Sequence, residues 1–181
     1  MAAPQRVRII GGTFRGRTVP VVVGAGVRPT PDRVRETLFN WLDQDLTGTA
    51  TLELYAGTGV LSLEALSRGA TLAVAVDRSP ALIASLRGVA ERFGAAGLES
   101  HVGDALRHLR LEQRRFDVVF LDPPFDDDAW DARFAALLPR LAPGARVYAE
   151  AARALVAPPS LRVAKHARAG AVHYHLLTPI A

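Results

Sequence analysis

The segment FDVVFLDPPFDDD, residues 116–128, places a carboxylate, two prolines and an aromatic ring directly after an apolar run. Proline removes a backbone donor and fixes φ, and it pushes the residue before it into an extended conformation. We therefore expect Asp122, Pro123, Pro124 and Phe125 to form a stiff ledge after a buried strand. An ionised carboxylate and the Pro123 carbonyl only accept hydrogen bonds, so the ledge suits an amine, while the ring suits a stacked base. The alternative is a simple strand terminator with Phe125 in the core.

Glycines and carboxylates also follow three earlier predicted strands. Gly57 and Gly59, in ELYAGTGVL, let the backbone turn sharply and let a ligand approach without meeting a Cβ atom. Asp77 lies 18 residues after Gly59, close to the spacing at which an acid holds the ribose hydroxyls of a nucleoside. Asp104 follows the third strand. Because ligands of open α/β sheets bind beyond the carboxyl ends of the strands, these residues predict a nucleoside cofactor site.

Two further positions narrow the identity of the cofactor. The third glycine of the dinucleotide fingerprint is absent, since position 62 is Ser62, and Glu53 stands in the first strand. An acid suits a cationic ligand with a free amino group better than a pyrophosphate, although NAD stays the rival. The predicted cofactor-binding residues are Glu53, Ala56, Gly57, Thr58, Gly59, Asp77, Arg78, Asp104 and Ala105.

Strands and helices alternate from residue 50 onward. Ser79 and Pro80 predict a helix start, and Gly69 and Gly94 predict helix ends. Strands that are apolar throughout indicate a parallel sheet covered on both faces, hence an α/β fold. Two strands near the C-terminus are expected to close the sheet as an antiparallel pair. The predicted strands are 51–57, 71–77, 98–105, 116–122, 145–151, 161–170 and 171–179, and the predicted helices are 59–69, 79–94, 106–113 and 126–141.

The first 40 residues differ from the rest in charge and pattern. They carry seven arginines and two acids, whereas the remaining 141 residues carry 15 basic and 16 acidic side chains. Residues 6–23 predict a hairpin, and the following helix is expected to have Thr30 as its N-cap and Pro31 as its first residue. We therefore divide the chain into a basic extension, residues 1–45, and a main domain, residues 46–181. Such an appendage is typical of proteins that bind a polyanion.

Composition excludes several classes of protein and site. The chain of 181 residues suffices for one domain with a core, and the lack of cysteine excludes disulfides and thiolate metal sites. No run approaches the ~18 apolar residues of a membrane span, and the N-terminus lacks a signal core, so we expect a cytoplasmic protein. His173 and His175 share one face of a strand, but no obvious third ligand accompanies them. We expect no metal site.

These strings together resemble a known family. ELYAGTGVLSLEALSRGA, the Val-Asp pair ending in Asp77, and LDPPF are similar to class I S-adenosylmethionine-dependent methyltransferases. With RIIGGTFRGR and RPTPDRVRETLFNWL included, nearly the whole chain resembles the bacterial 16S ribosomal RNA guanine-N2 methyltransferases of the RsmD type. The resemblance implies a Rossmann-like sheet of seven mostly parallel strands with an S-adenosylmethionine pocket over the first four. It also implies methylation of one guanine, of the guanine-966 type, in assembled small-subunit RNA. One departure is the short connector at residues 153–160, which leaves little room for a helix.

The resemblance implies that the basic extension binds RNA and that the ledge binds the target base. Arg15, Arg17 and Arg33 are expected to hold RNA phosphates, and Arg28 or Arg35 the ribose-phosphate near the pocket mouth, unless they face water or pair with acids. The target base must leave its stack to react, and no metal is needed because a sulfonium is already activated. An adenine N6 amine would fit the ledge equally, so only the resemblance selects guanine. More distant alternatives are an NAD-dependent oxidoreductase and a noncatalytic RNA-binding module.

Overall fold

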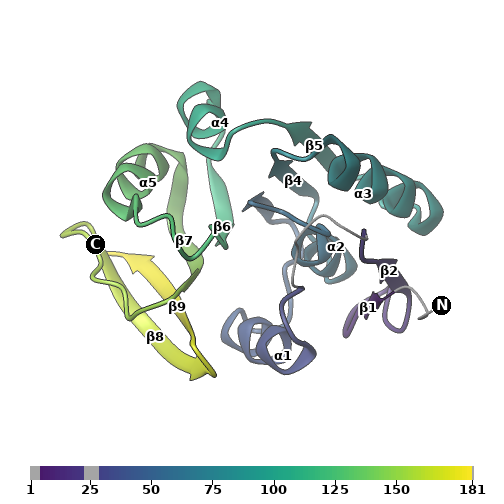
Figure 1. Cartoon of the computed structure of the whole chain (residues 1–181), viewed down its shortest axis with the longest axis horizontal. Helices are drawn as coiled ribbons and strands as arrows, with labels where there is room; N and C mark the ends of the chain where they lie inside the picture. Colours follow the sequence, from purple (N-terminus) through teal and green to yellow (C-terminus); the bar gives the residue numbers. More distant parts are fainter. Residues whose placement is uncertain (1–4, 23–28, 181) are drawn as a thin grey trace.

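The computed structural model describes residues 5–22 and 29–180. Its centre is a seven-stranded sheet in the order β5, β4, β3, β6, β7, β9, β8 (Figure 1). The five strands from β5 to β7 run parallel, and β9 pairs antiparallel with both β7 and β8. This arrangement confirms the predicted mostly parallel sheet with an antiparallel closing pair. The strands are β3 (Ala50–Leu54), β4 (Leu72–Asp77), β5 (Leu98–Val102), β6 (Phe116–Leu121), β7 (Leu141–Ala151), β8 (Leu161–Ala169) and β9 (Val172–Pro179).

Helices cover both faces of the sheet, as predicted. One buried cluster contains residues of the first three helices, and the other contains residues of the last two. The sheet supplies alternate side chains to each cluster, because successive residues of a strand point to opposite faces. The connector at residues 153–160 contains no helix, in agreement with its length. The helices are α1 (Asp32–Trp41), α2 (Val60–Ser67), α3 (Pro80–Phe93), α4 (Ala105–Leu111) and α5 (Trp130–Leu137), and a 3₁₀ turn follows at Leu138–Arg140.

Helix ends confirm some sequence predictions and correct one. The Ser79 hydroxyl accepts a hydrogen bond from the Leu82 amide, and Gly94 ends α3 in the left-handed conformation, as predicted. The prediction for Thr30 is wrong, because Pro31 occupies the N-cap position of α1 and no side chain caps this helix. The Thr30 hydroxyl instead donates a hydrogen bond to Glu150 Oε1 at 3.2 Å. A contact with a residue 120 positions away is invisible to local helix rules.

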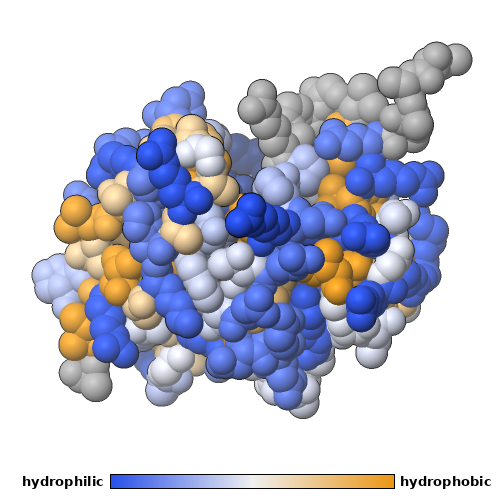
Figure 2. Space-filling model, turned by 90° about the horizontal axis from the view of Figure 1, so that it is seen from below, coloured by the Kyte–Doolittle hydropathy of each residue, from blue (hydrophilic) through white to orange (hydrophobic). Residues whose placement is uncertain are grey.

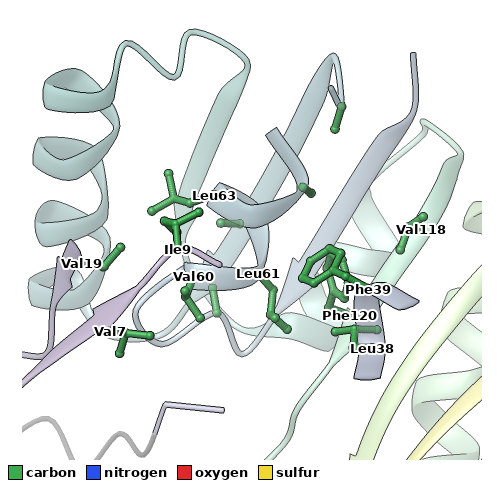
Figure 3. Packing of buried hydrophobic residues seen from close by; sticks show 14 of the residues in the cluster. Val7, Ile9, Val19, Leu38, Phe39, Val60, Leu61, Leu63, Val118 and Phe120 are labelled. Atoms are coloured by element: carbon green, nitrogen blue, oxygen red, sulfur yellow. The ribbon is translucent and has the colours of Figure 1, made fainter. Parts of the chain in front are cut away.

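The N-terminal hairpin packs on α2. Strands β1 (Arg6–Arg8) and β2 (Thr18–Pro20) pair antiparallel, and Figure 3 shows hairpin side chains, including Ile9, among those of α2, such as Leu63. The Ile10 amide donates to Glu64 Oε1 at 2.7 Å. At Gly12 φ is +70°, and a Cβ atom there would lie 1.8 Å from the Ser67 carbonyl oxygen, so only glycine allows this approach. The predicted hairpin is confirmed, and its apolar side chains lie in the same core as α1 and α2.

The strand order fixes where a ligand can bind. The chain leaves β3 toward β4 on one side and later returns to β6 on the other side of β3. Such a reversal opens a crevice beyond the carboxyl ends of the central strands. Within the described residues, none of the helices has the length and apolarity required to span a bilayer.

Candidate active site

A cleft lies at the carboxyl ends of β3 and β6, where the strand order predicts a ligand. Its enclosed volume is about 40 Å³, and the total rises to about 370 Å³ when adjoining space open to solvent is included. Five of the predicted site residues line it, namely Glu53, Ala56, Gly57, Thr58 and Asp122. The other lining residues are Pro29, Thr30, Leu54, Tyr55, Val60, Leu61 and Phe120. Among the described residues of the N-terminal extension, Pro29 and Thr30 therefore line the cleft, although sequence reasoning had not assigned them to the site.

The loop between β3 and α2 turns at two glycines. Gly57 and Gly59 have φ values of 55° and 69°, a region in which glycine carries no steric penalty. A Cβ atom on Gly59 would lie 2.5 Å from the Leu86 side chain, so α2 approaches α3 this closely because position 59 is glycine. The Ala56 amide donates to the Val76 carbonyl at 3.0 Å, which fixes the loop against β4. The loop is thus a rigid wall of the cleft.

Asp77, at the end of β4, holds the same loop in place. Its Oδ2 accepts a hydrogen bond from the Gly57 amide at 2.9 Å, and its Oδ1 accepts one from the Ser79 amide at 2.8 Å. A carboxylate has about four lone-pair sites, so both oxygens keep capacity for a ribose hydroxyl. Asp77 is not among the residues that line the cleft. Its role in cofactor binding stays a prediction, and the structure adds a role in positioning the loop.

Glu53 lies buried beneath the loop. Its Oε2 accepts hydrogen bonds from the amide and the hydroxyl of Ser62, in the first turn of α2. Burial raises the pKa of Glu53 to about 7, against the opposing effect of the Ser62 hydrogen bonds. Ser62, which replaces the third glycine of the dinucleotide fingerprint, therefore orients an acid on the cleft wall. Binding of a cofactor amino group by Glu53 stays a prediction.

The ledge has the exposure expected of a binding surface. Asp122 follows β6 and lines the cleft, Pro123 is buried, and Pro124 is exposed. The Phe125 side chain is 49% exposed, which excludes the alternative that it belongs to the core. A free aromatic ring next to a cleft carboxylate is the arrangement that base stacking requires.

A third acid, Glu150 on β7, completes a carboxylate group that sequence reasoning missed. Glu150 is buried, and its Oε1 accepts hydrogen bonds from the Tyr148 hydroxyl at 2.7 Å and from Thr30. Burial, followed by the negative charges of Glu150 and Glu53, raises the pKa of Asp122 well above its usual value. The signal was present in the sequence, because Glu150 is the second-last residue of the fifth predicted strand, and the register of β6 and β7 places it on the same sheet face as Asp122.

Arg78 and Asp104 form a pair beside β4 and β5. Their side chains make an ion pair, and Asp104 Oδ1 also accepts a hydrogen bond from the Arg107 amide at 2.8 Å, which caps α4. The Arg78 hydrogen bond is the main reason that the pKa of Asp104 is lowered. Ala105, the buried first residue of α4, follows directly. None of these three predicted residues lines the cleft, so their part in cofactor binding stays a prediction.

Arg133 ties the ledge segment to the glycine loop. It is 1% exposed, and its Nε donates to the Tyr55 hydroxyl at 3.0 Å. Its Nη1 donates to the Asp127 carbonyl at 3.1 Å, and its guanidinium also pairs with the Asp127 carboxylate. Helix α5 consequently begins at Trp130, later than the predicted residue 126, because residues 126–129 serve as this connection. No local pattern marks an arginine in an amphipathic helix for such a role.

The five arginines of the extension that were predicted to bind RNA differ in their exposure to solvent. Arg15 and Arg33 are exposed, and Arg28 lies outside the described residues. The prediction for Arg35 is wrong, because its side chain is fully buried and pairs with Asp32 and Glu64. A buried guanidinium cannot reach a phosphate.

The Arg17 side chain also makes contacts within the protein, at the end of α3. Its Nη1 donates to the Phe93 carbonyl at 3.0 Å, and its Nη2 donates to the Arg92 carbonyl. The guanidinium lies 4.0 Å from the centre of the Phe93 ring. A cation on the last carbonyls of a helix is favoured by the helix dipole, so Arg17 caps α3 rather than presenting its charge to a phosphate.

The charges of the cleft indicate which ligand it suits. Among the described residues, its lining includes Glu53 and Asp122 but no basic side chain. The two carboxyl groups disfavour a pyrophosphate, whereas a cation with an amino group and ribose hydroxyls would meet acceptors. The described residues also hold no group of three or more histidines and acids suited to a metal ion. The arrangement fits a cationic nucleoside such as S-adenosylmethionine.

The chain is similar to known proteins over most of its length. A family model described as Conserved hypothetical protein 95 matches residues 7–178. "Ribosomal RNA small subunit methyltransferase D" of Haemophilus influenzae is 35% identical over 96% of this chain and 94% of its own length. The Escherichia coli K12 protein of the same name is 41% identical over 66% of this chain and 61% of its own length. The solved structure of "Putative methyltransferase yhhF" from Escherichia coli matches with a TM-score of 0.88 and 35% identity, over 98% of this chain and 99% of that one.

Proposed function

The chain belongs to the Conserved hypothetical protein 95 family, the RsmD family, and on this premise we propose that it methylates the exocyclic N2 amine of one guanine in 16S ribosomal RNA. The target is guanine 966 or its equivalent, and the methyl donor is S-adenosylmethionine. Such an enzyme works in the cytoplasm, on a small-subunit particle. Residues 1–45 serve as the RNA-contacting extension, through Arg15 and Arg33, and residues 46–181 form the catalytic domain.

One observation carries the proposal: the glycine loop and Asp122 line the same acidic cleft. The loop is the part of the fold that binds a nucleoside, and Asp122 is an acceptor suited to an amine. The cleft therefore unites a cofactor wall with a site for the nitrogen that receives the methyl group. An NAD-dependent oxidoreductase fits less well, because the lining formed by the described residues offers two acids and no basic group to a pyrophosphate.

Asp122 and Pro123 act on the amine through hydrogen bonds. The lone pair of a guanine amine is delocalised into the ring, which makes the amine a poor nucleophile. If the Asp122 carboxylate and the Pro123 carbonyl accept its two hydrogens, the nitrogen becomes more tetrahedral and its lone pair can point at the methyl group. When bound, S-adenosylmethionine supplies that methyl group on an activated sulfonium. The methylated nitrogen then loses a proton, and the raised pKa of Asp122 makes it a suitable base.

Two measurements test the proposal. Isothermal titration should show binding of S-adenosylhomocysteine but not of NADH. Incubation with ribosomal RNA, either free or in small-subunit particles, followed by mass analysis of the nucleosides, should show N2-methylguanosine. The Asp122→Ala variant should keep its affinity for S-adenosylhomocysteine and lose at least ~100-fold in turnover. Formation of N6-methyladenosine would replace guanine by adenine as the target, and binding of NADH alone would refute the methyltransferase.

A further inference from the structure

The C-terminal hairpin, β8 and β9, has a charge distribution that the proposed function does not use. Residues 151–181 contain four basic side chains, three histidines and no Asp or Glu. Residues 41–150, in contrast, contain 11 basic and 16 acidic side chains. Because β8 is an edge strand, residues Arg162 to His166 are exposed along most of it. An acid-free basic edge is the electrostatic footprint of a polyanion partner.

Strand register places the end of this hairpin beside the candidate active site. His173, at the start of β9, pairs with Ala151 of β7 on one side and with Arg168 of β8 on the other. Ala151 directly follows Glu150, a member of the carboxylate group. Strands lie about 4.8 Å apart, so three steps separate β8 from β6 by about 14 Å. The turn between β8 and β9 thus flanks the edge of the sheet at which Asp122 lies.

The pictures agree with this placement. In Figure 1 the arrowhead of β8 and helix α1 lie at the same, lower side of the molecule. Figure 2 views the molecule from that side and shows a largely hydrophilic surface with small hydrophobic patches. α1 follows Pro29 and Thr30, which line the cleft. A chain lying across this side could contact both α1 and the hairpin.

Three histidines stack on this hairpin. The His166 ring is nearly parallel to those of His173 and His175, with centres 5.2 and 4.6 Å away. His175 is fixed, because its Nε2 accepts from the Leu155 amide at 3.1 Å and its Nδ1 bonds to the Ala149 carbonyl. The sequence pattern indicated only His173 and His175 and therefore omitted the third ring, His166. His166 is exposed and forms the outer member of a fixed stack, a platform of the kind on which unpaired bases stack.

We propose that the half of the hairpin nearest its turn, which we call the hairpin tip, is a second RNA-contacting surface that holds nucleotides next to the target base. Strand register places His166, Arg168 and His173 on one face of this exposed edge and Lys165 on the other, so an RNA chain would contact both by passing around the edge. Lys165 and Arg168 bind phosphates, and His166 stacks on a neighbouring base. The Arg168 Nε donates to the Gly170 carbonyl at 2.7 Å, which fixes its guanidinium and leaves the outer N–H groups free for a phosphate. This surface rests on the proposed RNA substrate, and it would keep the flanking chain in place while the base enters the cleft.

A matched pair of double variants tests the tip. Lys165→Gln with Arg168→Gln removes two charges there, and Arg110→Gln with Arg115→Gln removes two exposed charges near the start of β6, at the opposite edge of the sheet. The tip variant should bind ribosomal RNA about five- to tenfold more weakly, with a salt slope lower by about 1.4 for two single-strand contacts. The control variant should bind as the unmodified protein does. His166→Ala should also raise KM for RNA, without changing the salt slope.

The readouts separate this surface from the proposed reaction. The tip variants should keep the affinity for S-adenosylhomocysteine and the kcat at saturating RNA, while KM rises. The proposal that the tip contacts RNA would be refuted if the tip variant and the unmodified protein had the same RNA affinity and the same salt slope. It would also be refuted if the control variant lost as much RNA affinity as the tip variant. The RNA-binding assay needs no turnover, so it tests the hairpin tip even if no methylated nucleoside forms. The absence of a methylated nucleoside would count against the proposed reaction only.

Discussion

Replacing Arg35 by methionine should destabilise the fold without directly removing an RNA contact. The buried Arg35 guanidinium pairs with Glu64 at 2.7 Å and donates to the carbonyls of Thr30 and Arg8 at 3.1 and 2.9 Å. Methionine keeps much of the volume but removes the Arg35 donor from the two carbonyls and one of the two guanidinium partners of Glu64. Removing one partner of a buried pair costs about 3–5 kcal/mol, and we expect the lower value because Glu64 keeps Arg68 at 3.2 Å. For a chain of this size, about 3 kcal/mol corresponds to a fall in Tm of about 6–12 °C.

Urea denaturation and thermal unfolding measure this change, and Arg33→Met is the matched control. Arg33 lies on the same helix but is exposed, so its variant should unfold within about 0.5 kcal/mol of the unmodified protein. Arg33→Met should instead weaken RNA binding, since Arg33 is one of the two exposed arginines assigned to phosphates. The reasoning is refuted if Arg35→Met unfolds like the unmodified protein and loses RNA affinity. That result would indicate that Arg35 contacts RNA, as predicted from the sequence.

Three further substitutions test the cleft. Asp77→Ala should weaken S-adenosylhomocysteine binding in calorimetry and leave RNA affinity alone, because the Gly57 amide loses its acceptor; an unchanged Kd would show that Asp77 only terminates β4. Phe125→Leu should lower kcat/KM for RNA, as expected for a stacking contact of ~1–3 kcal/mol, while Tm stays constant because the ring is exposed; full activity would remove the ring from the site. Glu53→Gln should flatten the pH dependence of stability. The folded protein keeps a proton up to about pH 7 that the unfolded chain releases near pH 4.5, so the free energy of unfolding falls by about 3 kcal/mol as pH rises through this window. Parallel urea profiles of variant and unmodified protein at pH 4.5 and 7 would contradict this origin.

Patterns of nearby residues predicted most of the elements correctly. The Ser79 cap, the Gly94 stop and the turns at Gly57 and Gly59 follow from the conformations that single residues allow, and all of them occur in the structure. The alternation of apolar strands and helices sufficed for the parallel sheet. Helix starts were less certain where a distant partner competes for a side chain, as Glu150 does for Thr30.

The candidate site was only partly predictable. Its glycine loop and the Asp122 ledge are continuous strings, so they can be recognised in one dimension. Glu150 and Arg133 belong to the site through contacts with residues more than 70 positions away. Nothing in their own neighbourhood distinguishes them from other strand and helix residues.

The sequence by itself determined the α/β fold, the glycine turn, the strand-end acids and the family resemblance, because each depends on residue types at short spacing. Only the tertiary structure decided which charged side chains can contact a ligand and which are buried or paired within the protein. It buried Arg35 against Glu64, turned Arg17 onto the end of α3, and placed Glu53 and Asp122 in one cleft with the buried Glu150 close enough to act on Asp122. Charge counts treat all arginines and acids alike, whereas their chemistry depends on desolvation and on partners brought together by packing.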